Sequence, residues 1–198
     1  MSAARKTLLA LGAVALAQTL VLAWMVIERV WLIKTGREIT LPIEPVDPRD
    51  LFRGEYVRLA YPIARVPLGA VEGGAVRRND KVYVTLEKSA DDAWKPVAAA
   101  RWLRREDNPG RIVLKARATW APAQASSEAS AQAGADWRGP TVRYGIESYF
   151  VPQGQGRQLE ALAREKKLAI LVAVDWAGNT AIKGLVVDGK LQYEEPLF

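Results

Sequence analysis

A continuous apolar segment near the start of the chain constrains the fold more than any other feature. Residues 7–27 contain no charged side chain, and only Thr7, Gln18 and Thr19 among them are polar. In a helix rising about 1.5 Å per residue, about 20 residues span roughly 30 Å, the thickness of the hydrocarbon core of a bilayer. Residues 7–33 are therefore predicted to form a transmembrane anchor that lies in the lipid bilayer.

The flanks of this segment also suit a membrane interface. Glu28 and Arg29 follow it where long side chains can reach water, and Trp24 and Trp31 fit an interfacial aromatic belt. Basic residues flank both ends, so the predicted orientation depends on the shortness of the tail, with residues 1–6 in the cytoplasm. A cleaved signal peptide is the alternative, because Ala15–Ala17 resembles a cleavage site, although apolar residues continue beyond it.

Composition excludes several classes of chemistry. The 198 residues include no cysteine and no histidine, which excludes thiol and imidazole catalysis and Cys/His zinc sites. No cofactor and no metal site are predicted. Half of the net charge of +6 belongs to residues 1–38, where membrane topology accounts for it, and the rest is thinly spread. Nucleic acid is therefore not an expected partner.

Residues 38–198 show short apolar alternations separated by turn-forming residues, which is typical of β-strands. Strands are expected at 38–46, 56–61, 81–88, 94–103, 111–120, 141–151, 168–174, 181–187 and 191–193. Hairpin turns are expected at 175–179 and 188–189, a loop at 66–76, a short helix at 157–167 and a flexible low-complexity insertion near 121–137. The predicted fold is mainly β, an antiparallel barrel or sandwich with one short helix, joined to the N-terminal transmembrane helix. The aromatic residues Trp94, Trp102, Trp120, Trp137, Trp176, Tyr83 and Tyr193 are expected in core and hairpin packing.

A dense cluster of charges lies between the first two predicted strands. Three carboxylates and three guanidinium groups fall within twelve residues: Asp47, Arg49, Asp50, Arg53, Glu55 and Arg58. In a binding site, the arginines would hold a carboxylate or phosphate of a partner or ligand. Alternatively, the charges neutralise one another and shape the turn, with the aspartates capping backbone N–H groups.

Carboxylates and tyrosines farther along offer weaker candidates. Tyr56 and Tyr61 are expected on opposite faces of a strand. Glu147, with Tyr149 on its face and Tyr144 opposite, is a candidate buried acid of raised pKa. A glycosidase would need Glu55 and Glu147 at a defined separation. A Ser/Lys hydrolase would need a serine that the region before Gly54 lacks, so no catalytic residue is predicted.

Two segments resemble those of one bacterial family. Gly54–Tyr61 (GEYVRLAY) resembles the signature of the GDYXXLXY proteins, with Glu55 where the pattern has aspartate, and residues 45–53 resemble its lead-in. Tyr144–Pro152 resembles a later segment of the same family. The resemblance implies a membrane-anchored exported protein, often encoded beside multi-spanning membrane proteins. It implies no established activity. The predicted location is the bacterial cytoplasmic (inner) membrane, with the C-terminal domain periplasmic or extracytoplasmic.

These features together predict a non-catalytic accessory or scaffold subunit of an envelope membrane complex, with multi-spanning membrane proteins as partners. The alternatives are a binding module for a small molecule or envelope polymer and, least favoured, a Ser/Lys or carboxylate-dependent hydrolase. The candidate binding residues are Asp47, Arg49, Asp50, Arg53, Gly54, Glu55, Tyr56, Arg58, Leu59, Tyr61, Tyr144, Gly145, Glu147 and Tyr149. If the two segments converge on a cleft they form a site; if they only pack together, their role is structural.

Overall fold

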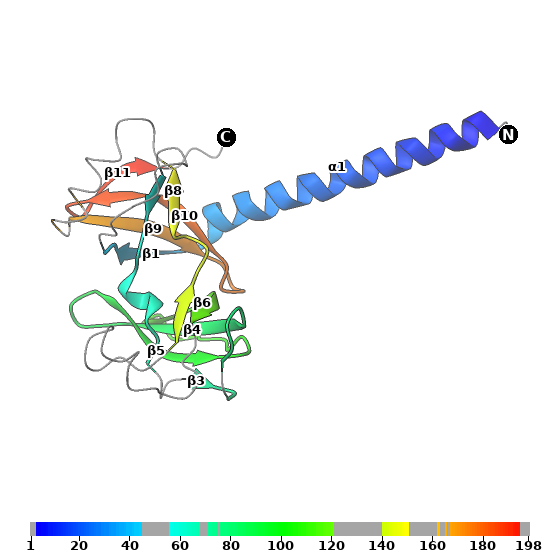
Figure 1. Ribbon diagram of the computed structural model, residues 1–198. Helices are drawn as coiled ribbons and strands as arrows, with labels where there is room; N and C mark the ends of the chain where they lie inside the picture. The colour runs from blue at the N-terminus through cyan, green and yellow to red at the C-terminus, as the bar shows by residue number, and fades with distance from the viewer. Residues whose placement is uncertain are drawn as a thin grey trace.

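The computed structural model describes residues 3–44, 56–67, 71–74, 76–120, 140–150, 162, 165 and 167–194. One long helix leads into sheets of four, five and two strands (Figure 1). The prediction of a mainly β fold behind one N-terminal apolar helix is confirmed. The insertion near 121–137 and most of the helix expected at 157–167 lie outside the described residues.

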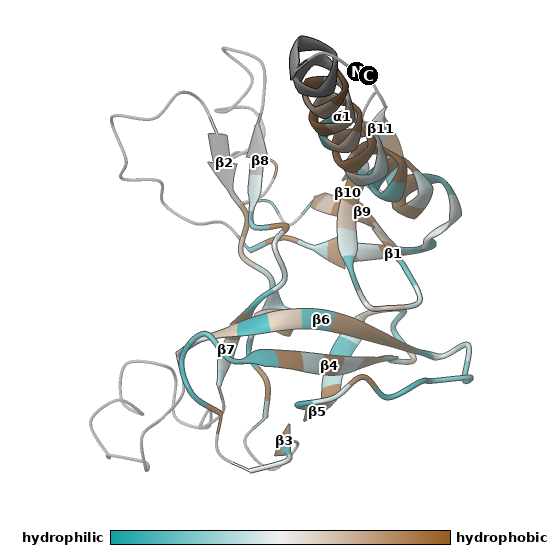
Figure 2. Ribbon diagram, turned by 90° about the vertical axis from the view of Figure 1, so that its right-hand side faces the viewer, coloured by the Kyte–Doolittle hydropathy of each residue, from teal (hydrophilic) through white to brown (hydrophobic). Residues whose placement is uncertain are grey.

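Helix α1 (Ala3–Thr35) is apolar on every side and stands away from the sheets (Figures 1 and 2). Within it, Leu9–Thr35 is long and apolar enough to cross a membrane by length and composition. The hydroxyl groups of Thr19 and Thr35 are satisfied inside the helix, because each donates to the carbonyl four residues before. From Leu9 to Ile27 the helix therefore presents a charge-free, predominantly apolar surface suited to lipid or to neighbouring helices.

The helix passes into the first strand through a single residue, Gly36. The Gly36 N–H donates to the carbonyl of Leu32 over 2.9 Å, and the Leu32 side chain is buried. One turn earlier, the Arg29 guanidinium donates to the carbonyl of Thr180 over 3.0 Å. Helix and domain are thus fastened together at two levels, with no flexible linker between them.

The end of helix α1 leads directly into the four-stranded sheet. Its order is β1 (Arg37–Pro42), β9 (Leu168–Val174), β10 (Thr180–Val187) and β11 (Lys190–Glu194), and every pair is antiparallel. The two predicted hairpin turns are confirmed. In the first, Asp175 Oδ1 accepts the N–H groups of Ala177 and Asn179 over 2.9 and 2.8 Å, which closes the turn.

The five-stranded sheet has the order β3 (Val71–Glu72), β5 (Trp94–Ala100), β4 (Lys81–Lys88), β6 (Arg111–Trp120) and β7 (Thr141–Arg143). All pairs are antiparallel except β3 with β5. Strand β3 lies within the segment expected to be a loop, and β5 ends at Ala100 rather than at residue 103. Alternation places Val82, Val84 and Leu86 on the core face and leaves Lys81 and Glu87 on the other face.

The two-stranded sheet pairs β2 (Tyr56–Arg58) with β8 (Ser148–Phe150), and a 3₁₀ turn η1 (Pro62–Ala64) follows β2. The predictions of single strands over 56–61 and 141–151 were therefore wrong in extent. The second breaks into β7 and β8 around a tight turn at 144–147, where Gly145 has φ of 86°. Only a residue without a Cβ adopts that conformation at little cost.

One hydrophobic cluster joins the sheets. Its largest fully buried side chains include Leu41, Ile170 and Val172 from the four-stranded sheet and Leu86 and Leu114 from the five-stranded sheet. Trp94 packs in this core as predicted. The expectation was wrong for Trp102, Trp176 and Tyr193, which are 50%, 78% and 45% exposed.

We expect Gly36→Ala to destabilise the domain by about 1–3 kcal/mol, because a Cβ at Gly36 would lie 2.5 Å from the carbonyl oxygen of Leu32 and 3.0 Å from the nitrogen of Val174. Both contacts are with backbone, which cannot rotate aside. Thermal unfolding of the full chain in a mild detergent would measure the loss. Gly12→Ala is the matched control, because nothing lies within 4 Å of its added Cβ. Equal unfolding midpoints for the two variants would contradict a tight junction.

Candidate functional site

The two segments singled out in the sequence run antiparallel, side by side. Beyond the β2–β8 pairing, the Leu59 N–H donates to the Glu147 carbonyl over 2.9 Å, and the Val66 N–H donates to the Pro140 carbonyl over 3.1 Å. We call residues 56–66 with 140–150 the signature ribbon. It runs from the four-stranded sheet, where Ala60 bridges to Glu44, to the five-stranded sheet, where it becomes β7 (Figure 1).

Two tyrosines lock the ribbon reciprocally. The Tyr61 hydroxyl donates to the carbonyl of Ile146 over 2.6 Å, and the Tyr144 hydroxyl donates to the carbonyl of Ile63 over 2.7 Å. Both side chains are buried. Burial, and secondly the negative charge of Glu147, raises the pKa of both phenols above the usual range. Each strand of the ribbon therefore supplies one donor to the other in a dry environment.

Glu147 closes the turn that interrupts the ribbon. Its carboxylate accepts the N–H groups of Tyr144 and Gly145 over 2.5 and 3.0 Å, and Arg143 lies 3.8 Å away. The side chain is 23% exposed. The expectation of a regular strand around a buried acid was wrong, because the Glu147 carboxylate is partly exposed and accepts hydrogen bonds from backbone N–H groups of a turn.

The described members of the predicted site pack together more than they line a cleft. Leu59 and Tyr61 are buried, and only Tyr144 and Gly145 also reach the cleft described below. The charged turn lies outside the described residues: Asp47, Arg49, Asp50, Arg53, Gly54 and Glu55. The side chains of Tyr56, Arg58 and Tyr149 are outside as well, and their backbones are placed by the β2–β8 pairing. The relation of Glu55 to Glu147 and the opposite faces of Tyr56 and Tyr61 stay predictions.

One serine does meet a lysine. The Lys95 ammonium donates to Ser89 Oγ over 3.1 Å. The contact lies on the exposed β4–β5 hairpin, the Lys95 side chain is 60% exposed, and its amine also lies 3.7 Å from Asp91. A Ser/Lys hydrolase needs this pair inside a cleft that excludes water, so the contact gives no support to a hydrolase. The Lys115 ammonium, which lines the cleft described next, donates to Asn179 Oδ1 over 2.9 Å.

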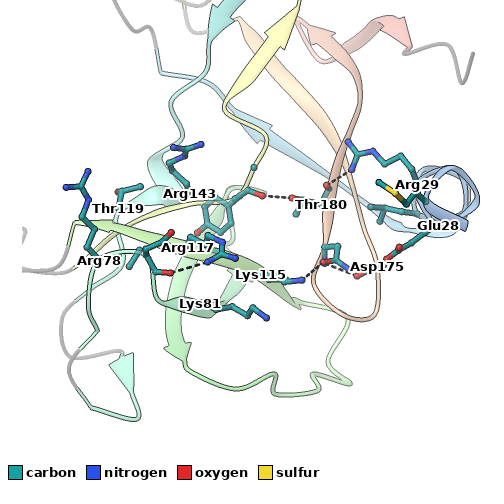
Figure 3. Close-up of a pocket in the computed structure, with 18 residues that line it drawn as sticks. Glu28, Arg29, Arg78, Lys81, Lys115, Arg117, Thr119, Arg143, Asp175 and Thr180 are labelled. Atoms are coloured by element: carbon teal, nitrogen blue, oxygen red, sulfur yellow. Dashed lines mark hydrogen bonds between the residues drawn. The ribbon is translucent and has the colours of Figure 1, made fainter. Parts of the chain in front are cut away.

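A cleft of about 970 Å³ opens beside the end of helix α1 (Figure 3). Its walls come from the helix, the first hairpin of the four-stranded sheet, the signature ribbon and the edge of the five-stranded sheet. Two acidic residues, Glu28 and Asp175, contribute to it. Six basic residues do so: Arg29, Arg78, Lys81, Lys115, Arg117 and Arg143. The cleft is therefore strongly electropositive.

Three of these basic residues form a row across the sheet. Lys81 on β4 lies opposite Arg117 on β6, and Arg117 lies opposite Arg143 on β7. Directly opposite residues share a face, with Cβ atoms about 4.5–5.5 Å apart, and like charges there are destabilising. The arrangement concentrates positive charge at a cost in stability, so it would favour the binding of an anion.

Little negative charge offsets this row. The Asp175 carboxylate accepts hydrogen bonds from backbone N–H groups of its own turn. The Arg117 guanidinium donates to the backbone carbonyl of Asn79 over 3.2 Å. Among the described residues, Arg143 is the member of this row with a carboxylate nearby, that of Glu147 at 3.8 Å. Within the described part of the chain, Arg78 and Lys81 have no carboxylate within 4.0 Å.

A second groove of about 780 Å³ lies on another side of the same helix end. Trp24 and Trp31, two turns apart on the helix, line it together with Trp176 from the first hairpin. All three rings are more than two-thirds exposed. Three exposed tryptophan rings, two from the helix and one from the hairpin, therefore gather around the helix end.

The sequence alone did not predict the basic cleft, because its basic residues are scattered along the chain between positions 29 and 143. The alternation Lys115, Arg117 on one predicted strand was the available signal, since residues two apart share a face. Recognising the row also requires the register of β4, β6 and β7, which a single sequence does not give.

The architecture defines the class: a β-sheet domain fastened to one apolar helix, with its two signature segments joined as a ribbon. The family model described as GDYXXLXY protein matches residues 18–185, and the chain belongs to this family. No curated protein and no solved structure matches the chain. The family signature thus includes Leu59 and Tyr61, both buried in the ribbon.

We expect Tyr61→Phe and Tyr144→Phe each to lower the free energy of unfolding by about 1–3 kcal/mol, because each leaves a buried carbonyl without its donor. Chemical denaturation of the detergent-solubilised chain would measure this. Tyr193→Phe, at an exposed position, is the control and should change stability by less than about 0.5 kcal/mol. If all three variants behaved alike, the hydroxyl lock would contribute nothing.

Stability should also fall in alkaline solution. The folded state holds the protons of Tyr61 and Tyr144 above the usual tyrosine pKa of about 10, whereas the unfolded chain releases them there. The free energy of unfolding should be level from about pH 7 to 9 and decline above about pH 10. The double variant Tyr61→Phe/Tyr144→Phe should show a shallower decline. A decline of unchanged slope would show that other groups cause it.

Proposed function

We propose that this protein is a membrane-anchored, non-catalytic accessory subunit of a bacterial envelope complex, with its β domain on the periplasmic side of the inner membrane. Its partners are multi-spanning membrane proteins. Helix α1 supplies a span of sufficient length, and its exposed apolar side chains offer a surface for lipid or for neighbouring helices.

The direct junction between helix and sheet carries this proposal. An enzyme or receptor that searches for soluble ligands is served by a flexible tether, which lets the domain sample many positions. Here Gly36, the buried Leu32 and the bond from Arg29 to Thr180 fix the domain to the helix end. A fixed height and orientation above the bilayer suits a subunit that must meet a membrane partner in one geometry.

The signature segments are consistent with a scaffold. Their described side chains satisfy backbone groups and fill the core, so the family pattern secures the ribbon that joins the sheets. None of these contacts presents a nucleophile or a free general base to a cleft.

A linker insertion tests whether rigid coupling matters. The tagged full chain would be isolated from its native membranes in mild detergent, with protease access to spheroplasts establishing the side of the β domain. We expect co-purification of a multi-spanning protein, and its loss when a flexible Gly/Ser linker of about ten residues separates Gly36 from Arg37. The linker variant should stay in the membrane fraction.

The control is the same insertion between Asp188 and Gly189, in the exposed turn before β11, which should retain the partner. Recovery of the unaltered chain alone, repeatedly, would refute the accessory role. Retention of the partner by the junction variant would refute the need for fixed geometry.

A further inference from the structure

We propose that the basic cleft binds the phosphate headgroup of an anionic phospholipid whose acyl chains lie along helix α1. The inference rests on the proposed membrane anchoring, but it does not depend on the partner proteins. The proposal also does not depend on which side of the membrane the domain occupies, because the cleft always faces the leaflet on the side of the domain.

The chemistry of the cleft favours an anionic phosphate. Lys81, Arg117 and Arg143 stand in one row across three strands, and Arg78 and Lys115 are further basic residues of the same wall (Figure 3). Guanidinium and ammonium groups together offer a phosphate many N–H donors. An anion placed among them would also relieve the repulsion within the row.

The opposite wall indicates that this phosphate belongs to a lipid. Met25 and Leu32 line the cleft from the helix, and Met25 is 61% exposed within the apolar stretch that ends at Ile27. A cleft with a basic sheet on one side and a membrane helix on the other matches the amphipathic shape of a phospholipid. A free phosphate would use only one of these walls, and about 970 Å³ is far more space than it needs.

The depth in the membrane agrees with this assignment. Glu28 and Arg29, which follow the apolar stretch, line the cleft, so its basic residues lie at the level where the helix leaves the hydrocarbon. Trp24, Trp31 and Trp176 line the neighbouring groove around the same helix end. Tryptophan is enriched at the headgroup level, which is also where lipid phosphates lie.

A titration of the full chain in a neutral detergent tests the proposal. Short-chain phosphatidylglycerol, short-chain phosphatidylcholine and inorganic pyrophosphate would be added separately, with intrinsic tryptophan fluorescence as the readout. We expect saturable binding of phosphatidylglycerol, weakening as salt rises, and no saturable binding of phosphatidylcholine. Saturable binding of pyrophosphate without phosphatidylglycerol would overturn the lipid assignment, and so would equal binding of the two lipids.

Charge-neutralising variants locate the site. Arg78→Gln/Lys81→Gln should weaken phosphatidylglycerol binding about thirtyfold, at roughly a factor of five for each basic residue removed. Both side chains are exposed, so the fold should persist, which the thermal unfolding midpoint would check. The control Lys95→Gln/Lys190→Gln removes the same charge outside the cleft and should bind as the unaltered chain does. Equal weakening by the two double variants would refute this site.

Different experimental outcomes would refute each of the two proposals. A chain that is released from washed membranes would undermine the anchoring on which both depend. A membrane-bound chain that co-purifies with its partner but does not distinguish the lipids would refute the lipid site alone. A chain that binds phosphatidylglycerol but is always recovered without a partner would refute the accessory role alone.

Discussion

The antiparallel pairing of residues 56–66 with 140–150 is the interaction on which the rest of the structure depends. It crosses from one sheet to the other and lies more than seventy residues apart in sequence. Tyr61 and Tyr144 each satisfy a carbonyl of the opposite strand from a buried position, where an unpaired carbonyl would be costly. Thr180 then donates to the carbonyl of Tyr144, which ties the ribbon to β10 beside the helix. The ribbon thereby helps to join the four-stranded sheet, beside the helix, to the five-stranded sheet, which carries the basic wall of the cleft.

Local patterns predicted the parts of the fold that depend on neighbours in sequence. The helix, the long strands β4, β6 and β9, and the turn closed by Asp175 all follow from hydrophobic periodicity or turn chemistry within a few residues. The prediction of one strand over residues 141–151 was wrong, because the alternation of apolar and polar residues continues through a turn. Glu147 closes this turn with its carboxylate. Very short strands such as β3 depend on a distant partner to exist at all, and no local signal specifies that partner.

The candidate site shows the same division. The charges near residue 50 stood out because they are adjacent in sequence, whereas the cleft gathers Arg29, Lys81, Arg117 and Arg143 from four elements. Strand alternation could place each of these side chains on a face. Only register could show that three of them lie opposite one another. Tyr61 and Tyr144 were recognised from the sequence, but their role as buried donors required the structure.

Because Gly36 alone separates helix α1 from strand β1, the helix sets the rotational orientation of the domain about the helix axis. Because a helix turns about 100° and rises about 1.5 Å per residue, one residue added before the junction would rotate the β domain by about a quarter-turn around the helix axis. The position along the axis would barely change, yet a different face of the domain would meet any neighbour of the helix. The length of helix α1 therefore also sets the rotational orientation of the domain. In related chains, insertions and deletions between the apolar stretch and β1 should be far less tolerable than changes of the same size in exposed hairpin turns.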